Sequence, residues 1–216
     1  MHKLKVQNLY DILRDSEHFL EPEFLLDVNP AYVAGKGEHL LQEVLYVLDG
    51  NAKKLPLLEH LKFDFKINRH VFIYDDQVHF NRYRLSTLKT DLYQLFNFPW
   101  VDGYKRLCRT FEKDCLKAGL QERIWIGPPI AKQLFGSSEE PGDLSGNGSA
   151  GWRLNGYNDA QYDLISRLHG YKLIRIPMYE NIMTGGSLKK IDDLLLNPKE
   201  ETYQAIKNWF FRKLEQ

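Results

Sequence analysis

LKFDFKINRHVFIYDDQVHFNRYR, residues 61–84, is the stretch that decides the predicted fold. Its first residues alternate between apolar and charged side chains, which is the pattern of a half-buried strand. A turn near Asn68 and Arg69 leads into a second strand that runs from His70 to about Asp75. The stretch therefore predicts a β-hairpin, and the end of this hairpin carries a dense polar cluster of Asp75, Asp76, His79, Asn81, Arg82 and Arg84.

The length of the turn decides which side chains of the hairpin share a face. With a two-residue turn at residues 68–69, Asp64 and Asp75 are diagonal neighbours with Cβ atoms roughly 7–8 Å apart or somewhat less. Lys62 falls on the same face, while the aromatic residues of both strands point to the core. A two-residue turn at residues 67–68 keeps these faces with a looser diagonal, whereas a three-residue turn would put the two carboxylates on opposite faces.

Two carboxylates and a lysine on one face have the chemistry of a magnesium site. Hard oxygen ligands suit Mg²⁺, and an ammonium group can contact phosphate. His79 follows Asp75 by four residues and could serve there as general acid or base. The planar forks of Arg82, Arg84 and Arg175 could hold phosphate oxygens. The simpler alternative is that Asp75 ends a strand and His79 lies in a hydrogen-bonded turn, and composition alone favours it.

Hydrophobic periodicity predicts further elements on both sides of the hairpin. A strand at 171–177 follows a helix that begins at Asn158 and stops at Gly170, and this strand could lie parallel to a hairpin strand. Residues 136–151 form a Gly/Ser-rich loop, either a functional flap or a mobile segment. The other expected elements are helices at 38–48, 85–96, 101–118, 187–195 and 199–214 and a short strand at 123–126.

The outer face of the helix expected at 101–118 is basic. It carries Arg106, Arg109, Lys113 and Lys117 at a spacing that lines side chains up along a helix. Such a face could contact a nucleic-acid backbone, and a solvated helix surface is the simpler alternative. Net charge over the whole chain is zero, with 29 basic and 29 acidic residues, so a nucleic-acid role depends on local patches rather than on overall charge.

The order of the expected elements predicts an α/β (α+β) fold with a small mixed sheet flanked by helices. The 216 residues suit a single domain, 1–216. Its core would comprise residues 36–84 and 157–177, with a helical and loop insertion at 85–156 and C-terminal helices at 186–215. Two cysteines, Cys108 and Cys115, are expected to be buried thiols. The N-terminus lacks the features of a signal peptide and no apolar run could span a membrane, so we expect a cytoplasmic protein without membrane contact.

The polar residues also occur in an order that resembles the PD-(D/E)xK superfamily, and within it the very-short-patch-repair endonucleases. Members of that branch carry an acidic residue on the first hairpin strand, an E-x-D-G-x-x-H-F block at the end of the second, and later D-x-x-R, a helix and G-x-x-v-x-R. VFIYDDQVHF supplies Asp75 and His79, and NDAQYDLISRLHGYKLIRI supplies Asp159, Gly170 and Arg175. HFNRYR also resembles an uncharacterised bacterial family with a D-E-x-x-H-F-N-R-Y-R block.

The resemblance implies a restriction-endonuclease-like core and metal-dependent phosphodiester hydrolysis. Mg²⁺ or Mn²⁺ would be held by Asp64, Asp75 and a helix carboxylate, Glu38 or Glu43. His79 would assist proton transfer, and Lys62 or Arg175 would steady the pentavalent phosphate. Contacts to nucleic acid, expected to be DNA, would come from Arg82, Arg84, Arg106, Arg109 and Lys113.

Three departures from the family pattern leave a second function open. Ile73 stands where the family has Glu, Asp76 where it has Gly, and Tyr162 where it has the Arg of D-x-x-R. Because a metal-binding carboxylate is missing from the central strand, the chain could instead be a catalytically inactive module that binds nucleic acid or a protein partner. A nuclease of the HNH kind is a weaker third alternative, since the block holds one histidine. The oligomeric state is left open.

Overall fold

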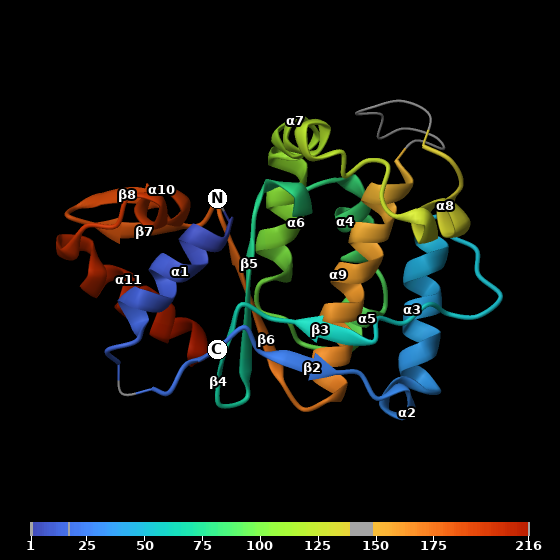
Figure 1. Ribbon diagram of the computed structural model, residues 1–216, viewed down its shortest axis with the longest axis horizontal. Coiled ribbons are helices and arrows are strands. Elements are labelled where there is room, and N and C mark those ends of the chain that lie inside the picture. The colour runs from blue at the N-terminus through green and yellow to red at the C-terminus, as the bar shows by residue number, and fades with distance from the viewer. Residues whose placement is uncertain (1, 17, 139–148, 216) are drawn as a thin grey trace. The chain divides into compact units, whose positions relative to one another are not determined.

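The computed structural model describes residues 2–16, 18–138 and 149–215. The helices are α1 (His2–Leu13), α2 (Pro30–Val33), α3 (Lys36–Val47), α4 (Arg82–Thr87), α5 (Leu92–Leu95), α6 (Val101–Thr110), α7 (Glu112–Glu122), α8 (Pro129–Phe135), α9 (Ala150–Leu168), α10 (Ile191–Leu196) and α11 (Glu200–Leu214) (Figure 1). The strands are β1 (Glu21–Pro22), β2 (Leu25–Asp27), β3 (His60–Lys62), β4 (Phe65–Ile67), β5 (His70–Asp75), β6 (Lys172–Pro177), β7 (Asn181–Thr184) and β8 (Ser187–Lys190), with a 3₁₀ turn, η1, at Gln77–His79.

The chain divides into two compact units, each assembled from separate segments. The sheet unit comprises residues 1–26, 61–76 and 170–216, and the helical unit comprises residues 27–60 and 77–169. The boundary at Asp76 and Gln77 passes through the polar cluster that follows the hairpin. The two units are therefore described separately.

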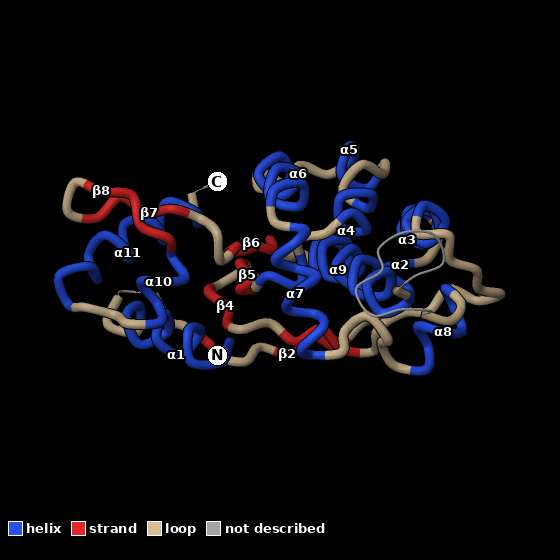
Figure 2. The backbone as a smooth tube through the Cα atoms, turned by 90° about the horizontal axis from the view of Figure 1, so that it is seen from above, coloured by secondary structure: helices blue, strands red, loops and turns tan. Residues whose placement is uncertain are grey.

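The sheet unit contains a four-stranded sheet in the order β1-β4-β5-β6. β4 pairs antiparallel with both β1 and β5, while β6 pairs parallel with β5. Figure 2 shows β4, β5 and β6 beside one another. The predicted mixed sheet and the predicted parallel strand at 171–177 are confirmed, and the fold is mixed α/β with a mixed sheet flanked by helices.

The hairpin turn has the length that the sequence favours. Ile67 pairs with His70, which leaves Asn68 and Arg69 as a two-residue turn. Asn68 has a φ of 53°, in the left-handed region that asparagine tolerates better than most residues. Local turn chemistry therefore fixes the register of β4 against β5.

Aromatic residues form the core of the sheet unit. Phe65 and Phe72, which pair across the hairpin, stack with ring centroids 4.7 Å apart, and Phe210 of α11 lies 4.8 Å from Phe72. Buried residues of α1, α10 and α11 complete this apolar cluster. Burial of a large aromatic side chain contributes about 1.5–3 kcal/mol each, so this cluster is a main source of stability for the unit.

The helical unit is organised around the long helix α9. This helix packs against α3, α4 and α8 (Figure 1). Trp152 of α9 is fully buried, and a Cβ atom built on Gly119 of α7 would lie 2.1 Å from the Trp152 ring. Glycine is therefore the residue that this close approach allows.

Several expected elements differ in the structure. The helix expected at 101–118 is broken at Phe111 into α6 and α7, and the one expected at 85–96 is divided into α4 and α5. Residues 123–126 form turns rather than a strand, and α9 begins at Ala150 rather than at Asn158. Residues 139–148 of the expected 136–151 loop lie outside the described residues.

The sequence interpretation also missed a hairpin. β7 and β8 pair antiparallel around Gly185 and Gly186, so residues 187–190 form a strand and α10 begins only at Ile191. Both glycines have positive φ values, 54° and 78°. A Gly-Gly pair between two short strands is a recognised signal for this turn, and the helix predicted at 187–195 is confirmed only from Ile191 onward.

The two cysteines are confirmed as buried free thiols. Burial raises the pKa of the Cys115 thiol to about 12. In the part of the chain that the structure describes, no helix combines the length and apolarity that a membrane span requires.

Candidate functional site

A buried ion pair joins the ends of the two parallel strands β5 and β6. Arg175 lies opposite Ile73 in the ladder, so its side chain shares a face with Asp75, two residues further along β5. Its Nη1 donates to Oδ1 and Oδ2 of Asp75 at 3.0 and 2.9 Å. The two side chains are 1% and 0% exposed. Burial of a charge is tolerable when it is paired, so each residue of this pair compensates the other.

Asp64 has a different set of contacts from those that the sequence predicts. It precedes β4, and its Oδ2 accepts a hydrogen bond of 2.7 Å from the main-chain N–H of Tyr74. Its Oδ1 lies 3.3 Å from Nε2 of His2, and the ring of His2 makes an edge contact with Tyr74. The carboxylate thus accepts a main-chain hydrogen bond near the end of β5 and contacts His2 of α1. These contacts give no support to a metal centre built from Asp64 and Asp75.

Lys62 and Glu43 also have partners of other kinds. Nζ of Lys62 lies 3.1 Å from Oε1 of Glu23, and both side chains are well exposed. Both carboxylate oxygens of Glu43 accept from the main-chain N–H of Asp91, which precedes α5. Glu43 thereby satisfies a backbone donor at the start of a helix, a position that favours negative charge. Its predicted role as a metal ligand stays a prediction.

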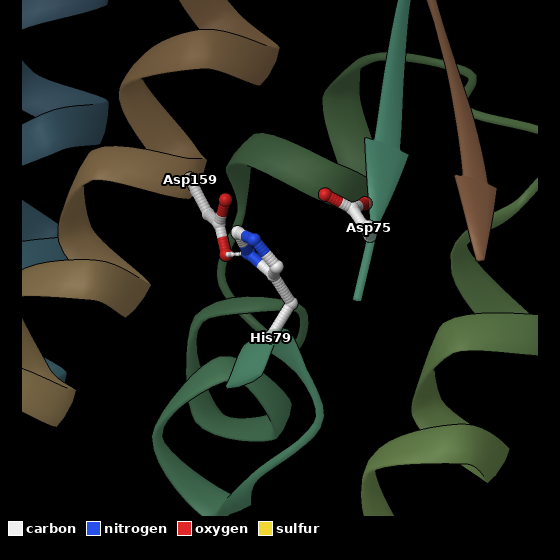
Figure 3. A group of neighbouring side chains, drawn as sticks. All are labelled: Asp75, His79 and Asp159. Carbon is white, nitrogen blue, oxygen red and sulfur yellow. Dashed lines mark hydrogen bonds and ion pairs between the residues drawn. The ribbon is translucent and has the colours of Figure 1, made fainter. Parts of the chain in front are cut away.

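A histidine–aspartate pair lies in the helical unit. Nδ1 of His79, at the end of η1, lies 3.0 Å from Oδ2 of Asp159 on α9 (Figure 3). The His79 side chain is 26% exposed and that of Asp159 is 9% exposed. When Nδ1–H donates to the carboxylate, the lone pair of the imidazole resides on Nε2. This arrangement orients the ring and sets its tautomer, as carboxylates do for catalytic and metal-binding histidines.

Local capping holds the segment that carries His79. The side-chain oxygen of Asn81 accepts from the main-chain N–H groups of Tyr83 and Arg84, both at 3.0 Å, and so caps α4. Its amide nitrogen contacts the carbonyl of Val78 and Sγ of Cys115. A buried asparagine with these partners fixes where η1 ends and α4 begins, and thereby where the imidazole points.

Arg84 is a structural residue, which corrects the prediction that it contacts nucleic acid. Its side chain is 1% exposed, and its Nη2 donates to Oδ2 of Asp163 at 2.6 Å. Nη1 donates to the hydroxyl of Tyr93 at 2.7 Å, and that hydroxyl in turn bonds to Asp163. A guanidinium that is enclosed in this way is inaccessible to a phosphate on the surface. No local pattern in the sequence links Arg84 to Asp163, because 79 residues separate them.

Arg82 is accessible to solvent and forms an ion pair with Glu112. Its Nε and Nη2 contact the two carboxylate oxygens of Glu112 at 2.9 and 3.0 Å. The hydrogen bond from Arg82 holds the pKa of Glu112 below its usual value. The Arg82 side chain is half exposed. Contact with nucleic acid would have to replace or share this bidentate pair.

The basic stripe expected on one long helix is divided between two helices. Arg106 and Arg109 lie on α6, whereas Lys113 and Lys117 lie on α7, beyond the break at Phe111. All four side chains are exposed. They are accessible to an anionic partner, but the straight helical row that the sequence predicts is absent.

Within the helical unit, His79 and Asp159 bring together an imidazole nitrogen and a carboxylate oxygen, two ligand atoms that could hold a metal ion. Carboxylate oxygens and a neutral imidazole nitrogen are ligands that Mg²⁺, Mn²⁺ and Zn²⁺ accept in different proportions. The sequence singled out Asp75 and His79 as site residues. It included Asp159 only through the family resemblance, because 80 residues separate this residue from His79 and no local pattern links them.

A family model described as a family of unknown function (DUF7255) matches residues 43–197. The matched range contains both ion pairs, Asp75–Arg175 and His79–Asp159. No curated protein and no solved structure matches the chain.

Proposed function

The chain belongs to the DUF7255 family of unknown function, and we propose that it hydrolyses phosphodiester bonds of nucleic acid with the help of a divalent metal ion. In this proposal the sheet is a restriction-endonuclease-like core, and His79 and Asp159 of the helical unit form the metal-binding group. The group replaces the Asp64, Asp75 and Glu43 set that the sequence suggests. The substrate is expected to be DNA.

One observation carries the proposal. The two stretches of sequence that resemble the nuclease family are joined by two side-chain pairs. The block that ends β5 supplies Asp75 and His79, and the later segment supplies Asp159 and Arg175. Asp75 pairs with Arg175 in the sheet unit, and His79 pairs with Asp159 in the helical unit. A chance similarity of short motifs gives no reason for both pairs of motif residues to meet.

The residue types fit a divalent metal ion. Asp159 offers carboxylate oxygens and His79 an imidazole nitrogen, and both kinds of ligand bind divalent ions in proteins. A bound divalent ion would supply a Lewis acid and a water of lowered pKa.

Other side chains of the protein would orient the histidine, position the Asp75 carboxylate and contact the nucleic-acid backbone. Asp159 orients the His79 ring through the Nδ1 contact, so the imidazole would meet a metal ion or a proton in a fixed orientation. Arg175 holds the Asp75 carboxylate in place at the end of β5. The exposed cations Arg106, Arg109 and Lys113 would contribute backbone contacts that salt weakens.

Cleavage of supercoiled plasmid in the presence of Mg²⁺ or Mn²⁺ tests the proposal. We expect activity in the wild type and a loss of roughly 10²–10⁴-fold in His79→Ala and in Asp159→Asn, the range typical of a lost proton-transfer group. The chain offers a matched control, because His60 and Asp27 form an exposed pair with a separation of 2.8 Å in the same unit. His60→Ala and Asp27→Asn should cleave like the wild type. Equal activity in all four variants would contradict the proposal.

A second candidate function is a catalytically inactive module that binds nucleic acid or a protein partner. It is favoured by Ile73 at the family's carboxylate position and by the complete burial of the Asp75–Arg175 pair. A positive guanidinium at 2.9 Å lowers the attraction of Asp75 for a second cation. A wild type that binds oligonucleotide, yet neither binds Mn²⁺ nor cleaves, would favour this function over hydrolysis.

A further inference from the structure

The segment between α5 and α6 encloses a solvent-open cavity in the helical unit. Its volume is about 460 Å³, within the usual range for small-ligand sites. The residues of its lining that matter here are Gln94, Phe96, Asn97, Phe98, Asp102 and Lys105. The cavity therefore combines aromatic rings, side-chain amides and a cation within one short stretch of chain.

Aromatic rings form a continuous run behind this cavity. The ring of Phe98 lies 5.5 Å from that of Tyr93 and 5.4 Å from that of Trp100, measured between centroids. Phe96 lies 6.4 Å from Phe98 and is half-buried, whereas Phe98 is 8% exposed. Rings at these separations support one another in the edge and tilted arrangements that aromatic pairs prefer. Phe96 and Trp100 are the half-buried members of this aromatic group, and Phe96 lines the cavity.

An arginine from α9 holds the segment in place. Nη2 of Arg167 donates to the carbonyl of Asn97 at 3.1 Å, and its guanidinium carbon lies 5.8 Å from the centroid of the Phe98 ring. The hydrogen bond and the cation–π contact tie the segment to the long helix of the unit. A loop that is ordered by a neighbouring helix can present a preformed binding surface.

We propose that this cavity binds one unpaired base of a nucleic-acid strand. The inference rests on the proposed function for the class of ligand, and on the cavity itself for the mode of binding. A base can stack on an accessible aromatic ring, as Phe96 provides. The side-chain amides of Gln94 and Asn97 offer donors and acceptors for a base edge. Lys105, 3.5 Å from Asp102, supplies an ammonium near the rim for the phosphate.

The long helix relates this cavity to the His79–Asp159 pair. Asp159 and Arg167 both lie on α9, eight residues apart, which corresponds to about 12 Å along the helix axis. A strand bound in the cavity could therefore present a nearby phosphodiester bond to the histidine. The base site would accordingly favour single-stranded or unpaired regions as substrate.

Fluorescence anisotropy with a labelled single-stranded oligothymidine in EDTA tests the inference without requiring hydrolysis. Phe96→Leu keeps an apolar side chain of similar bulk but removes the ring, and we expect about tenfold weaker binding. Tyr46→Ala is the control, because Tyr46 is an aromatic residue of the same unit with 79% exposure. It should bind like the wild type. Far-UV circular dichroism checks that both variants are folded.

A second probe distinguishes loss of base stacking from a non-specific effect of the substitution on strand binding. A strand of the same length with abasic positions should bind to the wild type about tenfold more weakly than oligothymidine, and Phe96→Leu should not distinguish the two strands. Equal binding of both strands by the wild type, or no binding of either, would overturn the inference. If base-dependent binding holds while plasmid cleavage is absent, the hydrolysis proposal fails and the base site stands. If the wild type cleaves plasmid but Phe96→Leu binds oligothymidine as tightly as the wild type, the hydrolysis proposal stands and the base site fails.

Discussion

Two ion pairs of similar chemistry connect the same two stretches of this sequence in different surroundings. Asp75 and Arg175 meet between parallel strands of the sheet unit and are almost completely buried. His79 and Asp159 meet between a 3₁₀ turn and a helix of the helical unit, and the histidine is 26% exposed. The first pair joins a carboxylate to a guanidinium, whereas the second joins a carboxylate to an imidazole.

The difference separates residues that hold the fold from residues that can perform chemistry. A buried Asp–Arg pair makes each partner costly to remove, because the other charge is then left without compensation. A partly exposed histidine beside a carboxylate is accessible to solvent and has its ring held in one orientation. In our proposal the motif residues of the sequence therefore divide into a structural pair, Asp75 and Arg175, and a functional pair, His79 and Asp159.

Removal of one partner of the buried pair should have the largest effect on stability. We expect Asp75→Ala or Arg175→Met to lower the free energy of unfolding by about 3–5 kcal/mol. The double variant should recover part of this loss, since it leaves no unpaired charge. Urea unfolding followed by circular dichroism measures all three. A loss below about 1 kcal/mol in Asp75→Ala would show that the pair is not buried as described.

Substitution in the second pair should change stability less. Asp159→Asn keeps the volume and one acceptor, so we expect a loss of about 1 kcal/mol in the free energy of unfolding. Asp27→Asn, which alters the exposed pair with His60, should lose at most a few tenths of a kcal/mol. Urea unfolding of both variants gives the comparison. If Asp159→Asn were as destabilising as Asp75→Ala, the contrast between a structural and a functional pair would be lost.

The surface pair of Arg82 and Glu112 should have the smallest effect, and its pH dependence has a defined sign. The pKa of Glu112 is lowered in the folded protein, so its contribution to stability is present above the unfolded value of 4.5 and is lost as the pH falls through the lower folded value. Because Arg82 is half exposed, we expect Glu112→Gln to cost less than about 1 kcal/mol at pH 7. The difference from the wild type should shrink below pH 4 and in high salt, as thermal unfolding across pH can show.

The sequence predicted the features that depend on local pattern. Alternation identified the hairpin, and turn chemistry at Asn68 gave the register that the structure confirms. The parallel strand at 171–177 was also correct, because a strand that follows a long helix commonly returns parallel to its sheet. The mixed sheet and most helix positions could be predicted from hydrophobic periodicity and from the glycine and proline residues that end helices and strands.

Features that depend on distant contacts were beyond the sequence. Strand parity placed Asp64 on a polar face, but the residue precedes β4 and turns its carboxylate to the N–H of Tyr74. Arg84 looked like a surface cation because its partner Asp163 is 79 residues away. The break at Phe111 follows no glycine or proline, and we have no physical account of it. Tertiary contacts decided the placement of Asp64 and of Arg84.

Binding of Mn²⁺, followed by isothermal titration calorimetry, tests most directly the claim that the His79–Asp159 pair is functional. The account predicts one bound ion per chain in the wild type and in His60→Ala, and no measurable binding in His79→Ala or Asp159→Asn. Both variants should unfold cooperatively in urea, which separates loss of binding from loss of the fold. Undiminished Mn²⁺ binding by His79→Ala, or an absence of binding in the wild type, would contradict the account.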